Sequence, residues 1–121
     1  PAISFVGMSP TVVRMAFFEG AFKPGAAAAF FAYAHDRLVP LWTAFPGLAS
    51  FRMMPGGRSD DGAHPFVLML EFTYSSQEAM DEALASPTRA ESREVTKGLF
   101  EFFDGRISHI VVEPIDLAPQ R

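Results

Sequence analysis

The sequence predicts an α+β domain in which one four-stranded antiparallel sheet carries its helices on a single face. Short apolar runs rich in Val, Ile, Phe and Met alternate along the chain with alanine-rich or amphipathic stretches at helical spacing. Clusters of Gly, Pro, Ser and Asp separate these segments and give the order strand, helix, strand, strand, helix pair, strand. The 121 residues fit a single domain over 1–121, with an N-terminal arm at 1–10 and a C-terminal tail at 114–121.

The first half of the predicted domain holds a strand, a long helix and a second strand. Residues 11–18 are apolar and β-branched and end before Glu19, which favours a strand. Pro24 suits the first turn of a helix, and the alanines that follow favour its continuation to about residue 45. Pro40 removes a backbone donor inside this helix, which predicts a kink or a division into two pieces. Residues 48–54 then form the second strand.

The second half holds a hairpin partner, two helices and a last strand. A polar loop at 55–62 leads into a strand over 66–73. Ser75 and Glu78 have the spacing of a capping box, and Ser86 with Pro87 marks the start of another helix. The fourth strand is expected over 106–113. The resulting βαββαβ order is the ferredoxin-like arrangement.

Composition and charge exclude several kinds of site and partner. The chain has no cysteine, which excludes disulfides and thiolate metal sites. No apolar run approaches the roughly 20 residues of a membrane span. The net charge of −4, without a cluster of Lys and Arg, argues against nucleic acid. Because no metal-binding, cofactor-binding or leader motif occurs, we expect no metal, no cofactor and a cytoplasmic location.

The predicted strands are apolar on both faces, which predicts a homodimer. Runs such as VVRMAFF and FVLMLEF lack the alternation of a sheet with one wet face. Helices cover one face, so an apolar second face remains, and a two-fold contact between two sheets would bury it. The alternative is that residues 1–10 and 114–121 cover this face within one chain.

His35 is the first candidate for chemistry. Phe31, His35, Leu38 and Trp42 share one helical stripe, so we expect His35 to face the sheet in an apolar cavity that Phe31 and Trp42 shape. A histidine in such a cavity stays neutral near neutral pH and accepts a proton. The alternative is a hydrogen-bonded histidine of the core.

Polar side chains inside apolar strands form a second group of candidates. His109, Arg14 and Arg52 interrupt strands and each needs a partner, so together they are suited to a carboxylate, enolate or phenolate. The alternative is that the arginines form ordinary ion pairs with Glu71 or Glu113.

The tyrosines and the first residue are weaker candidates. Tyr33 and Tyr74 are the two tyrosines of the chain, and each is suited either to proton donation or to packing. Pro1 would offer a secondary amine, as in proteins that resemble the tautomerase superfamily, but the apolar run at 11–18 separates it from the predicted helix, unlike in those proteins.

Three segments resemble the dimeric α+β barrel superfamily, and within it the EthD-like proteins: FFAYAHDRLVPL at 30–41, PGLASFR at 46–52 and LEFTYSSQEAMDEALASP at 70–87. The resemblance covers about residues 11–113. It departs from the family at Pro40, five residues after His35, and at Ala27, where the family has an aromatic residue. It implies homodimers in which two sheets form a barrel and each helix-to-sheet cleft holds a hydrophobic ligand.

The resemblance also implies relatives with several activities: cofactor-free isomerases, polyketide cyclases, decarboxylases and monooxygenases, and proteins without a known reaction. Our hypothesis is a cofactor-independent enzyme that transfers a proton on a hydrophobic aromatic, lactone or polyketide-like substrate, with His35 and His109 as catalytic candidates. The alternatives are a cofactor-free monooxygenase and a dimer that binds a hydrophobic ligand or serves only a structural role.

Overall fold

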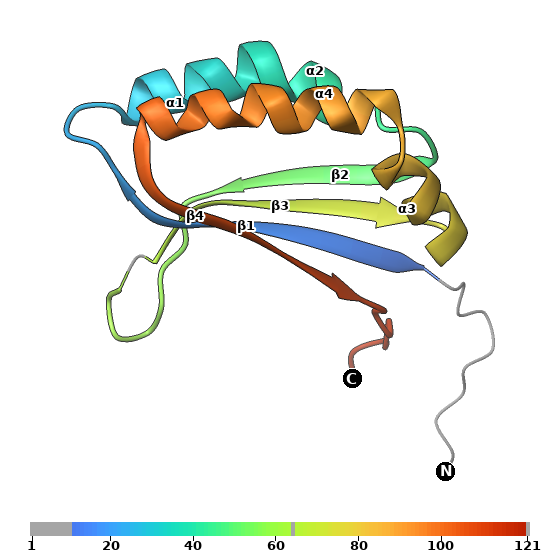
Figure 1. Ribbon diagram of the computed structural model, residues 1–121. Helices are drawn as coiled ribbons and strands as arrows, with labels where there is room; N and C mark the ends of the chain where they lie inside the picture. The colour runs from blue at the N-terminus through green and yellow to red at the C-terminus, as the bar shows by residue number, and fades with distance from the viewer. Residues whose placement is uncertain (1–10, 64, 121) are drawn as a thin grey trace.

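One antiparallel sheet with helices on one face forms the part of the chain that the computed structural model describes, residues 11–63 and 65–120 (Figure 1). The strand order is β2-β3-β1-β4. The strands are β1 (Val12–Phe22), β2 (Leu48–Pro55), β3 (Phe66–Tyr74) and β4 (Phe103–Val112). The predicted α+β, ferredoxin-like class is therefore confirmed. The arm expected at 1–10, including Pro1, lies outside the described residues.

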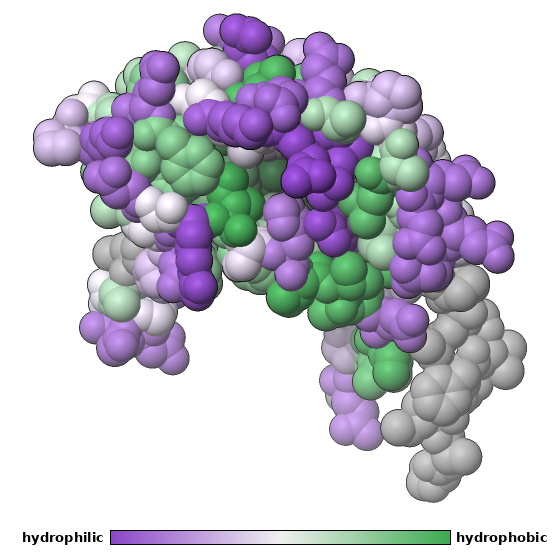
Figure 2. Space-filling view, viewed as in Figure 1, coloured by the Kyte–Doolittle hydropathy of each residue, from purple (hydrophilic) through white to green (hydrophobic). Residues whose placement is uncertain are grey.

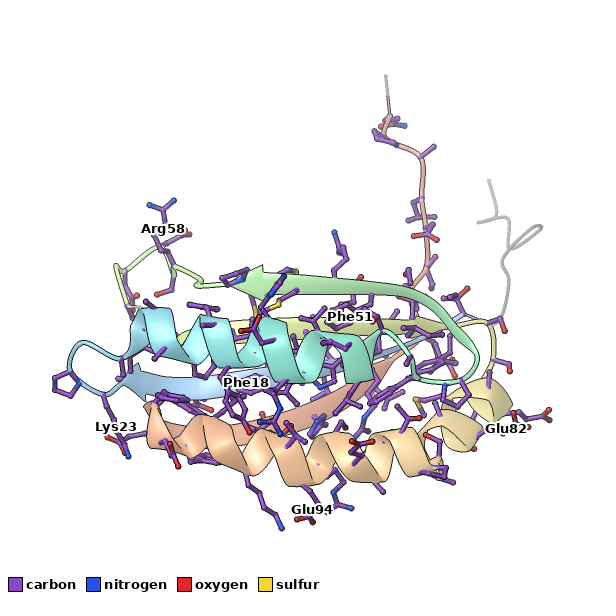
Figure 3. All side chains as sticks on the ribbon, turned by 90° about the horizontal axis from the view of Figure 1, so that it is seen from above. Phe18, Lys23, Phe51, Arg58, Glu82 and Glu94 are labelled. Carbon is purple, nitrogen blue, oxygen red and sulfur yellow. The ribbon has the colours of Figure 1, made fainter. Side chains whose placement is uncertain are left out.

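The helices form one layer above the sheet. They are α1 (Ala27–Tyr33), the π-helical turn η1 (Ala34–Leu38), α2 (Val39–Trp42), α3 (Gln77–Leu84), α4 (Pro87–Thr96) and the 3-10 turn η2 (Lys97–Glu101). Seen from above, the run from α1 to α2 lies beside α4 over the length of the sheet (Figure 3). None of the helices in the described residues is long and apolar enough to cross a membrane.

Strand register decides which side chains meet the helices. Ala16 of β1 pairs with His109 of β4, and Arg14 of β1 pairs with Phe72 of β3. Because alternate residues of a strand share a face, these four side chains lie on the helix-covered face of the sheet. The buried core lies on this face too. Its largest fully buried members are Tyr74, Phe18, Phe30, Phe103, Leu38, Leu68, Leu70 and Leu99.

The first helix is interrupted by a π turn rather than by a kink at Pro40. The N–H of Val39 donates to the carbonyl of Ala34, five residues earlier. Pro40 has no N–H to donate to Asp36, and its ring would clash with that carbonyl in a regular helix. The wider turn just before Pro40 resolves this conflict, and α2 then begins with the proline in its first turn.

The second half differs from the prediction at two element starts. The N-cap of α3 is Ser76, whose hydroxyl accepts from the N–H of Ala79 at 3.1 Å, so the expected capping box at Ser75 is wrong by one residue. Ser86 caps α4 as expected, accepting from the N–H of Arg89 at 3.2 Å. Strand β4 begins at Phe103, three residues before the expected start at 106, because Asp104 and Gly105 continue the ladder opposite β1.

The opposite face of the sheet carries apolar side chains and an ion pair. Ile110 and Val112 of β4 are exposed there, beside Met15 of β1. Arg52 binds Glu71 through two hydrogen bonds of 3.0 and 2.9 Å. Figure 2 shows the molecule hollowed below the sheet, between the β2–β3 loop and the C-terminal tail.

Candidate functional site

A cavity of about 570 Å³ lies between α4 and the helix-covered face of the sheet. Its floor comes from β1, β3 and β4, and its roof from α4 and η2. The volume is within the usual range for sites that bind small molecules. Most of the floor and one wall are apolar, from Ala16, Phe18, Trp42, Phe45, Leu70 and Phe72.

Trp42 lies in the cavity wall, as the sequence analysis expects of it. Its ring centroid lies 5.9 Å from that of Phe51 on β2, and Phe45 stacks on Phe72 with centroids 5.2 Å apart. Ring contacts of this kind fix the positions of aromatic side chains. The wall is therefore a rigid, apolar surface suited to a flat hydrophobic guest.

His109 faces this cavity from β4, with one side open to solvent. Burial, and in addition the positive charges of Arg14, Arg89 and Arg93, lower its pKa to about 4. The imidazole is therefore neutral at pH 7 and free to accept a hydrogen bond or a proton.

Arg14 faces the same cavity from β1, half-buried, and burial lowers its pKa. Within residues 11–63 and 65–120 no carboxylate lies within 4.0 Å of it. Arg52 does not join it, because β2 directs Arg52 to the opposite face, where it binds Glu71. The expectation that both arginines share one site with His109 is wrong for Arg52, and the alternative of an ordinary ion pair is correct there.

Tyr74 ends β3 inside the cavity, and its residue is 0% exposed. Among residues 11–63 and 65–120 its hydroxyl has no hydrogen-bond partner, although buried polar atoms are normally paired. Burial raises the pKa of this phenol, while the charges of Arg14 and Arg89 act in the opposite direction. The Tyr74 hydroxyl is therefore a neutral donor that lies close to positive charge.

Arg89 and Arg93 of α4 complete the polar part of the cavity, and the sequence analysis missed them. They lie four residues apart, so they share one helix face, where two like charges destabilise each other by about 0.2–0.5 kcal/mol. Burial lowers the pKa of Arg89, and the charges of Arg93 and Arg14 lower it further. The like-charged pair at this spacing was the available sequence signal.

His35 is not part of the cavity, and the prediction that it faces the sheet is wrong. Its side chain is 81% exposed and bonds only to the neighbouring Asp36 carboxylate, with Nδ1 and Oδ1 3.1 Å apart. The buried stripe of this helix is Phe30, Ala34, Leu38 and Trp42, at a constant spacing of four. A π turn holds more residues than an α turn, so it keeps this spacing on one face and turns His35 outward.

Tyr33 and Phe31 lie away from the cavity as well. The Tyr33 hydroxyl donates a hydrogen bond to the carbonyl of Val95 at 2.7 Å, which joins α1 to α4. The Tyr33 ring occupies the space that a Cβ on Gly98 would need. Phe31 packs on Phe22 and Phe30 and lines a second hollow beside β2 and β3. Both expected substrate contacts are packing residues here.

Within the described residues, no group of three or more His, Cys, Asp or Glu side chains converges as metal ligands would. The polar groups that do converge are guanidinium, imidazole and phenol, which interact with oxygen-bearing and anionic groups of a ligand.

The fold and cavity define a ferredoxin-like α+β protein with a cavity between its helices and its sheet. No protein-family model and no curated protein matches the chain. Among solved structures it is similar to an EthD family protein from Bacillus halodurans, at 23% identity and a TM-score of 0.68, over 87% of this chain and 99% of that one.

Two further structures resemble the chain. One is SnoaB, a cofactor-independent oxygenase from Streptomyces nogalater, at 17% identity and a TM-score of 0.60, over 92% of this chain and 99% of that one. The other is a dimeric ferredoxin-like protein of unknown function from a Jannaschia species, at 19% identity and a TM-score of 0.61, over 86% and 99%. The predicted resemblance to EthD-like proteins is thus confirmed at the level of the fold.

The low pKa of His109 predicts how stability responds to acid. In the unfolded chain this imidazole titrates near its usual 6.5, and in the folded chain near 4. Between these values the unfolded chain binds the additional proton, so the free energy of unfolding falls as pH falls from about 6.5 and stops changing below about 4.

We expect His109→Gln to remove this component, so that its unfolding temperature falls less than that of the wild type between pH 6.5 and 4. Thermal unfolding followed by circular dichroism measures the difference. A His109 signal, assigned by its loss in His109→Gln, that titrates near 6.5 in NMR spectra of the folded protein would contradict the placement of His109 beside the three arginines.

Proposed function

We propose that the protein is a cofactor-independent enzyme that transfers a proton on a hydrophobic aromatic, lactone or polyketide-like molecule bound in the helix-to-sheet cavity. The observation that carries this proposal is the cavity of about 570 Å³, which joins aromatic walls to a neutral imidazole and a buried, unpartnered hydroxyl. Apolar walls with a few convergent polar groups and titratable groups of shifted pKa are typical of enzyme sites.

The proposed step uses three side chains. His109 accepts the proton of an acidic C–H bond next to a carbonyl, so that the C–H bond breaks and an N–H bond forms. The electron pair moves to the carbonyl oxygen and gives an enolate, to which Arg14 and Tyr74 donate hydrogen bonds. The imidazolium then returns its proton to a second carbon of the enolate, so that a C–H bond forms there, the carbonyl is restored and the isomerisation is complete.

Exchange of ligand protons for solvent deuterium tests the proposal. Aromatic acids, lactones and aromatic ketones are incubated with the protein in D₂O, and loss of the acidic C–H signal is followed by NMR. We expect His109→Gln to slow this exchange roughly 10²- to 10⁴-fold, the usual contribution of a general base.

The matched control is His35→Gln, because the His35 side chain is 81% exposed and does not line the cavity. We expect it to exchange at the wild-type rate. Equal loss in both variants, or exchange that persists in His109→Gln, rules out the assigned base.

A cofactor-free oxygenase is the second candidate, supported by the likeness to SnoaB. It predicts oxygen uptake with phenols that fit the cavity, whereas proton transfer predicts deuterium exchange without oxygen uptake. A ligand that binds with neither reaction indicates a binding protein.

We also propose that the chain forms a homodimer through the opposite sheet face. The exposed apolar side chains of that face support a partner surface, and two of the similar structures are described as dimeric. The cytoplasmic location and the single-domain organisation stay predictions.

A further inference from the structure

The cavity carries more positive charge than its own residues balance. Its charged lining consists of Arg14, Arg89, Arg93, Lys97, Arg106 and Glu94. Glu94 binds Lys97 at 3.0 Å, and Figure 3 shows Glu94 pointing outward from α4. Arg106 binds Glu19 at 3.1 Å. Three guanidinium groups, those of Arg14, Arg89 and Arg93, are left without a carboxylate within 4.0 Å in the described part of the chain.

On the opposite face of the sheet, by contrast, an arginine is paired with a carboxylate. Arg52 holds Glu71 with two hydrogen bonds, although its side chain is largely exposed. Arg14 and Arg89 are half-buried, where an unpaired charge is far more costly than at the surface, and yet no described residue pairs with them in this way. The missing partner is therefore expected to come from outside the chain.

The buried hydroxyl of Tyr74 independently indicates a ligand at the same place. It is fully buried, it lines the cavity, and no group of the described residues accepts its proton. It lies close enough to Arg14 and Arg89 for their charges to act on it. An oxygen anion bound here would accept from the phenol and from the guanidinium groups at once.

We propose that the ligand of this cavity is a hydrophobic carboxylate, whose anionic group is bound by Arg89 and Arg93 of α4, Arg14 of β1 and the Tyr74 hydroxyl. This inference rests on the proposed function and names the substrate class for the same cavity. An enolate exists only during turnover, so it balances one positive charge for part of the catalytic cycle. The three guanidinium groups are charged throughout that cycle. The apolar wall around Trp42 would hold the hydrophobic part of the same molecule.

The bound carboxylate also changes His109. The charged or titratable groups that act on its imidazole are Arg14 from β1 and Arg89 and Arg93 from α4. Tyr74 reaches the cavity from β3, whereas Trp42 and Phe45, which reach it from the segment between η1 and β2, are not charged or titratable. An anion among these arginines offsets their repulsion, so the pKa of His109 rises toward 6.5 and the imidazole becomes a stronger base only when the ligand is present.

Binding of biphenylacetate and of its uncharged isostere biphenylacetamide tests the inference. Trp42 is the single tryptophan of the chain and lines the cavity, so its fluorescence reports both ligands. We expect the carboxylate to bind at least about tenfold more tightly, as a hydrogen bond to a charged group implies. Arg89→Gln and Arg14→Gln should abolish the preference, and Arg52→Gln, the paired arginine of the other face, should keep it.

Two further measurements test the inference even if Arg14→Gln or Arg89→Gln fails to fold. Arg93→Gln changes a more exposed side chain and should weaken carboxylate binding in the same direction. In the wild-type protein, the His109 signal in NMR spectra, assigned by its loss in His109→Gln, should titrate at higher pH with biphenylacetate bound than with the amide bound.

The outcomes separate the inference from the proposed function. Equal affinity for acid and amide, or a preference that survives in Arg14→Gln and Arg89→Gln, overturns the inference and leaves the hydrophobic cavity as the binding site. Binding of neither compound overturns both. A preference lost in the two cavity variants and kept in Arg52→Gln supports the carboxylate.

Discussion

Ile110→Arg is expected to convert the proposed homodimer into monomers. Ile110 is 46% exposed on the sheet face opposite the helices, next to Met15 in the β1–β4 register. In a two-fold contact between sheets both subunits contribute the same face, so the substituted residue occurs twice in the interface. A charge left buried and unpaired costs roughly 3 kcal/mol or more, which weakens the dimer constant by about a hundredfold or more for each copy.

Val111→Arg is the matched control for this experiment. Val111 is 43% exposed on the same strand, but it points to the helix-covered side, so the added charge stays outside the proposed interface. Light scattering during gel filtration, over a range of protein concentrations, measures the mass of both variants. A wild-type monomer, or an Ile110→Arg protein that remains a dimer, contradicts a dimer through this face.

The strands were predictable from sequence because their boundaries depend on local chemistry. Apolar β-branched runs end at Gly and Pro, and the predicted ranges 48–54 and 66–73 each differ from the observed strand by one residue. The strand expected at 11–18 continues to Phe22. Gly20 and Gly105, which by themselves are typical of turns, lie opposite each other and keep β1 and β4 paired. Such pairing depends on a distant segment, which a local pattern does not contain.

The error at His35 has one physical origin. A helical stripe drawn at 3.6 residues per turn joins Phe31 to His35, but the π turn before Pro40 changes the phase by about one residue. One residue corresponds to roughly 100° of rotation, enough to move an imidazole from the sheet to solvent. The proline predicted an interruption of the helix but not which form it would take.

The arginines of α4 were missed for a different reason. Their spacing was visible, but a strip of alternating charges on a helix usually faces water. Arg89 faces the cavity because α4 buries Ser92, three residues later on the same helix face, and the following turn η2 buries Leu99. The burial of Ser92 depends on the packing of α4 over the sheet, so the inward face of the helix was not decided by its own sequence.

Gly20→Ala is expected to destabilise the fold more than a substitution at any freely exposed glycine. Gly20 lies opposite Gly105 in the β1–β4 ladder, and a Cβ on Gly20 would overlap the carbonyl oxygen of Asp104. Its φ of +143° is in addition a conformation that other residues rarely adopt. Backbone strain of about 1–3 kcal/mol and overpacking of about 1–3 kcal/mol together remove a large part of a stability of about 5–15 kcal/mol.

Gly25→Ala separates the two contributions. Gly25 also has a positive φ, +70°, but a Cβ there meets nothing within 4 Å, so only the backbone cost of about 1–2 kcal/mol remains. Denaturant unfolding of both variants gives the difference in free energy. Equal losses would mean that β1 and β4 can separate without cost at Gly20. A larger loss at Gly20 means that the close approach of the two glycines holds β4, and with it His109, beside β1 in the floor of the cavity.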